Sequence, residues 1–265
     1  MKTIVISNRK GGSAKTTTAV NLATELAKNH SVLLIDFDTQ GHASIGVGSA
    51  PLEEGGAHSI FFGKTLSENF VPTVLDGLTL APAHALFDVY EYSDLKGVLK
   101  NRFKKEQIAE FFDYCVIDTA PTFDALLKNS LEVADVVVIP FVPHHLGVVA
   151  VGQMVRAVYQ MSTQMGANIE HIGMLPVMFN PHINEHKESL AKVEGAFGKA
   201  KVFKPIGMDI KLAQMFESGQ PIVLSETRTK GMKNYTSFCK ELLKRIKGTS
   251  ENSIFTQRSF RGALK

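Results

Sequence analysis

Residues 10–17 of the chain read Lys10-Gly11-Gly12-Ser13-Ala14-Lys15-Thr16-Thr17. The apolar, β-branched run Ile4–Ile6 precedes this segment, and a stretch with helical periodicity follows it. Small residues between a strand and a helix let backbone N–H groups converge on phosphate oxygens, and the helix adds the positive end of its dipole. The segment therefore predicts a phosphate-binding loop, in which Lys15 reaches the β- and γ-phosphates of a nucleotide and the Thr16 hydroxyl binds Mg²⁺.

Two further apolar runs end in acidic residues. The first reads Leu33-Leu34-Ile35-Asp36-Phe37-Asp38-Thr39-Gln40-Gly41, and the second reads Tyr114-Cys115-Val116-Ile117-Asp118-Thr119-Ala120-Pro121. Because ligands of open parallel sheets bind outside the carboxyl ends of the strands, we expect these acids beside the phosphate loop. Mg²⁺ keeps several waters and few carboxylate ligands, so we expect Asp118 to hold the ion through water.

Elsewhere, apolar β-branched runs alternate with segments of helical period. This pattern predicts an α/β fold with one domain, a mostly parallel twisted sheet flanked by helices on both faces. The expected strands are Thr3–Asn8, Ser31–Asp36, Leu78–Ala81, Tyr114–Asp118, Val136–Pro140 and Ile172–Phe179. The expected helices include Lys15–Lys28, Phe123–Val133, Gly147–Met165, Asn184–Phe197 and Lys230–Lys247. We assign residues 1–247 to the domain, residues 248–265 to a basic, flexible tail, and Ala50–Ala57 to a surface loop.

Residues 10–17 resemble the deviant Walker A motif of the ParA/MinD family of P-loop ATPases, Lys-Gly-Gly-x-Gly-Lys-[Ser/Thr]-Thr. Two residues depart from that pattern, since Ala14 replaces the usual glycine and Arg9 stands at the first glycine of an ordinary P-loop. Residues 33–41 look like the family's Asp-x-Asp-Pro-Gln-Gly segment, and residues 114–121 look like its Walker B strand. The resemblance extends from about Lys2 to Lys247 and implies the P-loop NTPase fold.

The resemblance also implies ATP and Mg²⁺ as cofactors and slow ATP hydrolysis that a partner protein accelerates. In an ATP-sandwiched homodimer, Lys10 would contact the partner subunit's phosphates, much as an arginine finger does. Asp38 would position or deprotonate the attacking water, and Asp36 would support the Mg²⁺ shell and its own loop. Asn180 lies where relatives contact the base. The implied ATP-binding residues are Lys10, Gly11, Gly12, Ser13, Ala14, Lys15, Thr16, Thr17 and Asn180.

Charge is distributed unevenly along the chain. Residues 151–265 contain 17 Lys and Arg against 9 Asp and Glu, whereas residues 1–150 contain 12 against 17. A basic surplus suits a surface for phosphate polyanions, although ordinary solvated helix faces give the same composition. Residues 208–222 resemble the C-terminal part of ParA proteins that partition DNA, where a basic residue at the position of Lys211 contributes to non-specific DNA binding. Further candidates for this surface are Lys201, Lys204, Arg228, Lys230 and Lys233, while His182 stands where relatives use an arginine.

Together these features are similar to those of a cytoplasmic, nucleoid-associated ParA-type ATPase that binds double-stranded DNA non-specifically as an ATP-bound dimer. A ParB-like or cargo-adaptor protein would stimulate hydrolysis. The cargo would be a plasmid or chromosome locus, or a protein assembly such as a carboxysome or a chemoreceptor cluster. We expect no N-terminal helix-turn-helix domain, because the phosphate loop begins at Lys10.

Three other classes of protein share parts of this pattern. A MinD-like membrane ATPase needs a C-terminal amphipathic helix, but Ile254–Leu264 form no broad apolar face, so we expect no membrane partner. A nitrogenase-type iron protein needs clustered cysteines, whereas Cys115 lies inside a predicted strand and Cys239 on a late helix. A metabolic ligase or synthetase stays an alternative, although no acceptor-site motif is identified. His144 and His145 lack a third ligand residue nearby and are interpreted as loop residues rather than a metal site.

Overall fold

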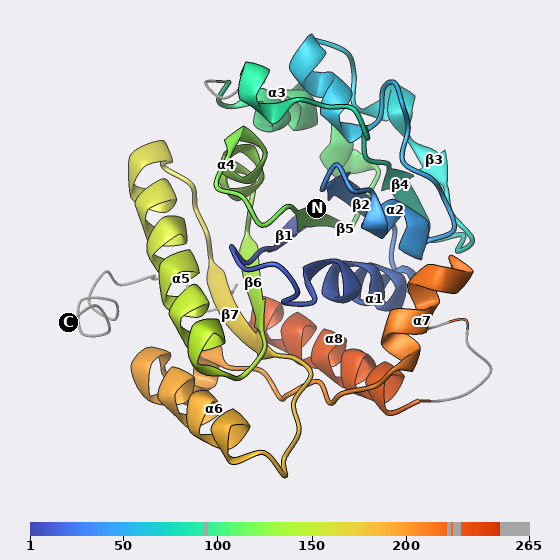
Figure 1. Cartoon of the computed structure of the whole chain (residues 1–265). Helices are drawn as coiled ribbons and strands as arrows, with labels where there is room; N and C mark the ends of the chain where they lie inside the picture. The colour runs from blue at the N-terminus through green and yellow to red at the C-terminus, as the bar shows by residue number, and fades with distance from the viewer. Residues whose placement is uncertain (93–94, 222–223, 225–228, 250–265) are drawn as a thin grey trace.

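The computed structural model describes residues 1–92, 95–221, 224 and 229–249, and its strands form one twisted sheet (Figure 1). The strands are β1 (Lys2–Ile6), β2 (Val32–Phe37), β3 (Val71–Pro72), β4 (Leu78–Ala81), β5 (Tyr114–Thr119), β6 (Val136–Phe141) and β7 (His171–Pro176). The α-helices are α1 (Lys15–Ala27), α2 (His42–Gly46), α3 (Val98–Lys105), α4 (Ala125–Glu132), α5 (His145–Met165), α6 (Asn184–Phe197), α7 (Lys211–Ser218) and α8 (Lys230–Thr249). Short 3₁₀ segments are η1 (Ala57–Phe62), η2 (Ser67–Asn69), η3 (Val89–Tyr92), η4 (Ile108–Glu110) and η5 (Lys199–Lys201).

The strand order places β1 near the middle of the sheet. The order is β3-β4-β2-β5-β1-β6-β7, and every pair is parallel except β3 with β4. The chain therefore extends from β1 to β2 and β5 on one side and to β6 and β7 on the other. Such a change of direction opens a crevice at the carboxyl ends of the strands, which is where α/β sheets bind ligands.

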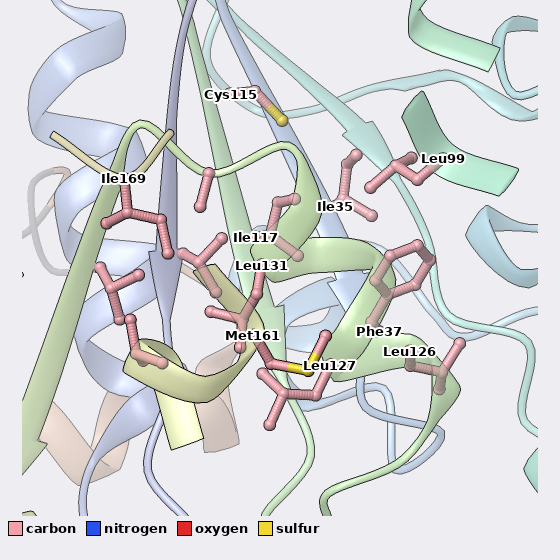
Figure 2. Packing of buried hydrophobic residues seen from close by; sticks show 14 of the residues in the cluster. Ile35, Phe37, Leu99, Cys115, Ile117, Leu126, Leu127, Leu131, Met161 and Ile169 are labelled. Carbon is pink, nitrogen blue, oxygen red and sulfur yellow. The ribbon is translucent and has the colours of Figure 1, made fainter. Parts of the chain in front are cut away.

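Both faces of the sheet are covered, so the strands are apolar on both sides. In β2, Leu33, Ile35 and Phe37 face one hydrophobic cluster, and Val32 and Leu34 face the other. The first cluster includes residues of α3, α4, α5 and α6, and Figure 2 shows its labelled side chains around the strands. The second cluster includes residues of α1, α7 and α8 (Figure 1). Burial of each large aliphatic or aromatic side chain stabilises the fold by about 1.5–3 kcal/mol. The core on both faces therefore holds the carboxyl ends of the strands in place.

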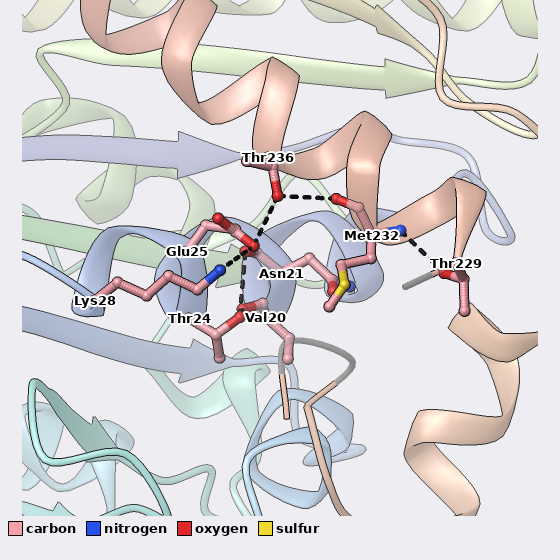
Figure 3. Close-up of polar contacts among 8 residues, drawn as sticks. All are labelled: Val20, Asn21, Thr24, Glu25, Lys28, Thr229, Met232 and Thr236. Atoms are coloured by element: carbon pink, nitrogen blue, oxygen red, sulfur yellow. Dashed lines mark hydrogen bonds and ion pairs between the residues drawn. The ribbon is translucent and has the colours of Figure 1, made fainter. Parts of the chain in front are cut away.

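Helix α1, which follows the phosphate loop, is tied to α8 by polar contacts (Figure 3). Glu25 Oε1 accepts hydrogen bonds from Lys28 Nζ at 2.7 Å and from Thr236 Oγ1 of α8 at 3.0 Å. The buried hydroxyls of Thr18 and Tyr235 lie 3.1 Å apart. These contacts fix α1, and with it the loop at its N-terminus, against the last helix.

The predicted α/β fold is confirmed, and the six predicted strands and five predicted helices all form. The strand Leu78–Ala81 and the helix Asn184–Phe197 have the predicted bounds, and the other elements differ at one or both ends. The predicted helix Phe123–Val133 begins at Ala125, because Asp124 caps it by accepting from the Leu127 N–H at 3.0 Å. The predicted strand Ile172–Phe179 ends at Pro176. Helices α3 and α7 were not predicted from the sequence. Helix α8 runs to Thr249, two residues into the predicted tail, and residues 250–265 lie outside the described residues.

The surface loop predicted for Ala50–Ala57 is partly wrong. Glu53 and Glu54 are exposed, but Gly56 and Ala57 are buried. The Ala57 N–H donates to the Pro82 carbonyl at 2.7 Å, and a Cβ on Gly56 would lie 2.4 Å from the same oxygen. Glycine at position 56 therefore permits a close backbone approach that draws the end of the loop into the molecule.

Candidate nucleotide-binding site

The loop between β1 and α1 has a backbone shaped for close contact with a ligand. Gly12 and Ala14 both lie in the left-handed region, with φ of 68° and 57°. Ala14 is the N-cap of α1 and offers no side-chain cap, so the first-turn N–H groups are left for a ligand. This conformation gives a physical reason for the glycine that the ParA/MinD motif has at the position of Ala14.

A cleft of about 530 Å³ lies against this loop. Its lining residues are Gly11, Gly12, Ser13, Ala14, Lys15, Thr16, Thr17, Asp38, Gln40, His42, Pro121, Met178 and Phe216. The structure thus brings the phosphate loop together with Asp38 after β2 and Pro121 after β5. His42, Met178 and Phe216 were not among the predicted site residues, because none belongs to a motif that the sequence identifies.

Lys15 is almost completely buried beside this cleft. Its side chain is 7% exposed, and Nζ donates to the Lys10 carbonyl at 3.4 Å. Burial lowers the pKa of Lys15, while the carboxylates of Asp118 and Asp38 act in the opposite direction. A buried ammonium with one weak acceptor among the described residues can pair with phosphate oxygens.

Asp36 and Asp118 lie side by side on neighbouring strands, because β2 and β5 pair them in register. Asp36 Oδ2 accepts from the N–H and hydroxyl of Ser44 at 2.8 and 2.7 Å, and Oδ1 accepts from the Asp38 N–H at 3.2 Å. Burial raises the pKa of Asp36 to about 6 despite these bonds. Asp36 therefore organises the loop that carries Asp38.

Asp118 contrasts with Asp36. Both of its carboxylate oxygens are buried without a hydrogen-bond partner among the described residues. Burial raises the pKa of Asp118 well above its usual value, and the neighbouring Asp36 raises it further, whereas the Thr16 hydroxyl and then the Lys15 ammonium oppose the shift. An orphaned buried carboxylate near Thr16 and a phosphate loop suits a magnesium shell, so these residues fit Mg²⁺.

A hydrogen bond fixes the Lys10 backbone, and the Lys10 side chain contacts the start of α5. Its N–H donates to Asn8 Oδ1 at 3.0 Å, and Asn8 Nδ2 donates to the Pro140 carbonyl of β6 at 2.7 Å. Lys10 Nζ lies 3.0 Å from Nε2 of His144, the N-cap residue of α5. His144 was interpreted from the sequence only as a loop residue.

A second pocket of about 360 Å³ adjoins the cleft and shares Ala14, Thr17 and Met178 with it. Its other lining residues are Val177, Ile206, Gly207, Met208, Asp209, Ile210, Leu212, Ala213 and Tyr235. Asn180 is not among the residues that line the two pockets, and its Oδ1 accepts from the His182 N–H at 2.9 Å. The assignment of Asn180 to the base stays a prediction, and the apolar pocket is a site that the sequence did not reveal.

Four of the predicted DNA-binding residues are exposed: Lys211 begins α7, Lys230 and Lys233 lie in the first turn of α8, and Lys204 precedes α7 in the chain. Asp209 links these two helices, since its carboxylate accepts from the Lys211 N–H at 3.0 Å and from the Gly231 N–H at 2.7 Å. Lys201 is half-buried, and burial lowers its pKa. Arg228 lies outside the described residues.

Comparison with known proteins places this site in a family. A family model described as "AAA domain" matches residues 1–171. The chromosome partitioning protein ParA of Myxococcus xanthus is 31% identical over 257 residues, which cover 91% of this chain and 88% of that protein. The chain belongs to the ParA family. The resemblance found in the sequence is therefore confirmed.

Solved structures agree with this ParA-family fold. The ATP complex of McdA from Cyanothece has a TM-score of 0.80 at 23% identity, covering 92% of this chain and 96% of that one. Cobyrinic acid a,c-diamide synthase from Mycobacterium smegmatis, with an ATP analogue and magnesium, has a TM-score of 0.78 at 25% identity and covers 97% and 99%. These neighbours contain the cofactors predicted from the sequence.

Among the described residues, no helix is long and apolar enough to cross a membrane. Within the same residues, no group of three or more His, Cys, Asp or Glu side chains is arranged to hold a metal ion. Cys115 and Cys239 are both buried, in the clusters on opposite faces of the sheet.

Proposed function

We propose that this protein is a ParA-type ATPase that uses ATP-controlled dimerisation and DNA binding to partition or position a cargo. One observation carries the proposal: the phosphate loop, the buried Lys15, the orphaned Asp118 and the cleft residue Asp38 meet at one edge of the sheet. The similarity to a partitioning protein over 91% of the chain supports the same function.

The chemistry follows from the placement of these residues. Lys15 and the N–H groups at the start of α1 bind the β- and γ-phosphates. Thr16 and Asp118 would hold Mg²⁺, with Asp36 supporting the shell, and the ion would supply positive charge beside the phosphates. Asp38 lines the cleft, and its Oδ1 accepts from the Gln40 N–H at 3.1 Å, which orients the carboxylate to position or deprotonate water.

Lys10 supplies the cation that joins two subunits. In the ATP-bound dimer it contacts the partner subunit's phosphates, where charge develops during hydrolysis. The same dimer aligns Lys211, Lys204, Lys230 and Lys233 of both subunits, together with Arg228, into one surface for double-stranded DNA. Doubling the phosphate contacts makes DNA affinity depend on dimerisation and on salt.

A ParB-like or cargo-adaptor protein accelerates the otherwise slow hydrolysis and so releases the dimer from the nucleoid. Repeated cycles then move or space the cargo. The fold is shared with a cobyrinic acid a,c-diamide synthase at 25% identity, so a small-molecule synthetase is the second candidate function. Rapid ATP turnover without DNA or a protein partner would favour that candidate.

Light scattering and ATP turnover test the proposal directly. The wild-type protein should be a dimer with ATP and a monomer with ADP. Lys10→Ala should bind ATP but stay monomeric and inactive, since the phosphates lose their trans cation. Lys64→Ala, which changes an exposed lysine that does not line the cleft, is the matched control. Normal dimerisation and turnover by Lys10→Ala would refute the trans-lysine mechanism.

A further inference from the structure

Nucleotide binding alone does not explain why the Lys10 side chain contacts His144. We propose that His144 is a positioning residue, which holds the Lys10 side chain on its own subunit without nucleotide and releases it when ATP closes the dimer. This inference rests on the proposed role of Lys10 in trans.

The position of His144 is fixed by the turn between β6 and α5. Its N–H donates to the Val142 carbonyl at 2.8 Å, and its Nδ1 accepts from the Gly147 N–H at 3.1 Å. A Cβ on Gly147 would lie 2.0 Å from the Val142 carbonyl oxygen, so only glycine permits this tight turn. His144 is therefore a rigid support for the Lys10 amine rather than a freely moving side chain.

The two bonds of the His144 ring compete with each other. When Nδ1 accepts from the Gly147 N–H, the neutral ring carries its proton on Nε2, the nitrogen that lies 3.0 Å from Lys10 Nζ; when Nε2 accepts from Lys10, the proton lies on Nδ1 and the Gly147 bond is lost. A lysine ammonium has three donors and no acceptor, so it cannot make a full hydrogen bond to a protonated Nε2. The ring can serve Lys10 only by giving up its cap on α5. Without nucleotide, His144 therefore holds Lys10 in the tautomer that gives up the Gly147 bond, and the loss of that bond makes the net hold on Lys10 weak.

Phosphate oxygens are better acceptors for the Lys10 ammonium than His144 Nε2 is, since they accept charge-assisted hydrogen bonds without giving up another partner. The anchor through Asn8 fixes the Lys10 backbone, so only the side chain needs to move. Burial lowers the pKa of His144, and the Lys10 charge lowers it further; the other charged or titratable groups acting on His144 are Glu185, which raises its pKa, and His186, which lowers it. ATP binding across the dimer should therefore draw Lys10 away and restore the cap of α5.

Substitutions at position 144 separate the cap from the contact with Lys10. His144→Asn keeps an acceptor at the position of Nδ1, and asparagine is a good N-cap residue, but the Nε2 contact is lost. Because Lys10 is then already free, the dissociation constant of the ATP-dependent dimer should fall about two- to tenfold for each subunit that carries the change. This factor corresponds to one net hydrogen bond. His144→Glu offers Lys10 a carboxylate and should weaken the dimer by at least as much. The exposed neighbour, changed by His145→Asn, is the control.

Sedimentation with ATP measures the dimer dissociation constants of these variants. NMR titration of His144 without nucleotide gives a second readout, in which Lys10→Met should raise the His144 pKa. Dimer formation by Lys10→Ala would refute the trans role itself. If Lys10→Ala stays monomeric while His144→Asn and His144→Glu match the wild type, the His144 inference alone is wrong. An unchanged His144 pKa in Lys10→Met would also overturn it.

Discussion

At the nucleotide site, Ala14 has a left-handed backbone conformation that is unfavourable for a residue with a Cβ. Its φ of 57° lies in the left-handed region, which costs a residue with a Cβ about 1–2 kcal/mol. The loop keeps this conformation because α1 is fixed on both sides, by the sheet and by α8. Strain at a position of this kind is compensated by the rest of the fold.

Ala14→Gly should therefore stabilise the protein. Relief of the left-handed alanine outweighs the greater flexibility of glycine in the unfolded chain, for a net gain of about 0.5–1 kcal/mol. Urea unfolding measures this difference. As a control, Ala19→Gly inside α1 should lower the free energy of unfolding by about 1 kcal/mol, because position 19 is helical and buried. Destabilisation by Ala14→Gly would show that the methyl group contributes packing instead.

Asp118 should make the protein without nucleotide and Mg²⁺ less stable as pH rises. Its folded-state pKa lies above the unfolded value, so its contribution is complete below about pH 3.9 and is lost as pH rises through the folded pKa. Asp36, with a pKa of about 6, adds to this loss between about pH 4 and 6. Asp118→Asn should remove part of this pH dependence and gain about 1–3 kcal/mol at neutral pH.

Urea unfolding in EDTA at pH 4 to 8 tests the role of Asp118, with the exposed Asp88→Asn as the control. With Mg²⁺ and ATP the wild type should be more stable than Asp118→Asn, because the Asp118 carboxylate then binds the magnesium shell. Parallel stability curves for the wild type and Asp118→Asn would contradict a destabilised buried carboxylate.

At the scale of elements, the short helix α7 connects the nucleotide site to the basic surface. Leu212 and Ala213 line the apolar pocket and Phe216 lines the cleft, while Lys211 at its start is exposed. Asp209 ties the start of α7 to the start of α8 through two backbone N–H groups. The Asp209 carboxylate therefore helps to fix Lys211 relative to Lys230, together with the packing of Leu212 against Gly231.

Asp209→Ala should loosen this junction. Loss of two capping bonds should cost about 1–2 kcal/mol of stability and weaken ATP-dependent DNA binding, although Asp209 is acidic and would itself repel DNA. Asp88→Ala is the control, because Asp88 also accepts from a backbone N–H, that of Tyr90, in an exposed loop. Tighter DNA binding by Asp209→Ala would mean that charge at this position matters more than the placement of the helices.

The sequence predicted the elements with strong local signals and missed those fixed by tertiary contacts. The runs that form β2 and β5 are apolar and end in acids, so both the strands and the edge carrying Asp36 and Asp118 were predictable. Helices α3 and α7 have only eight residues each and lack a side-chain cap at their N-termini, so each apolar pattern spans about two turns and has no start signal. Gly219, the left-handed C-cap of α7, marks the end of that helix.

The site was predictable where a motif names the residue and not where distant segments meet. Lys10, Lys15 and Asp38 were found because they belong to the phosphate loop and the acidic turn. The support of Lys10 by His144 was missed, since 134 positions separate the two residues. The apolar pocket combines residues near positions 14, 178, 208 and 235, and no single segment predicts it.

At the scale of the molecule, the acidic residues 1–150 and the basic residues 151–265 contribute different parts of the proposed function. Residues 1–150 supply the phosphate loop and the carboxylates, and residues 151–265 carry 17 Lys and Arg against 9 Asp and Glu. If the basic lysines of both subunits face DNA only in the dimer, ATP controls DNA affinity through the number of phosphate contacts. Nucleotide state and DNA binding are then coupled without a separate DNA-binding domain.

Binding to a random DNA duplex tests this coupling most directly. Asp38→Ala should bind ATP without hydrolysing it, so its affinity for DNA would be measured with ATP, with ADP and without nucleotide across a salt series. Binding only with ATP, falling steeply as salt rises, is the predicted result. Equal binding in all three states, or none in any of them, would contradict an ATP-controlled DNA-bound dimer.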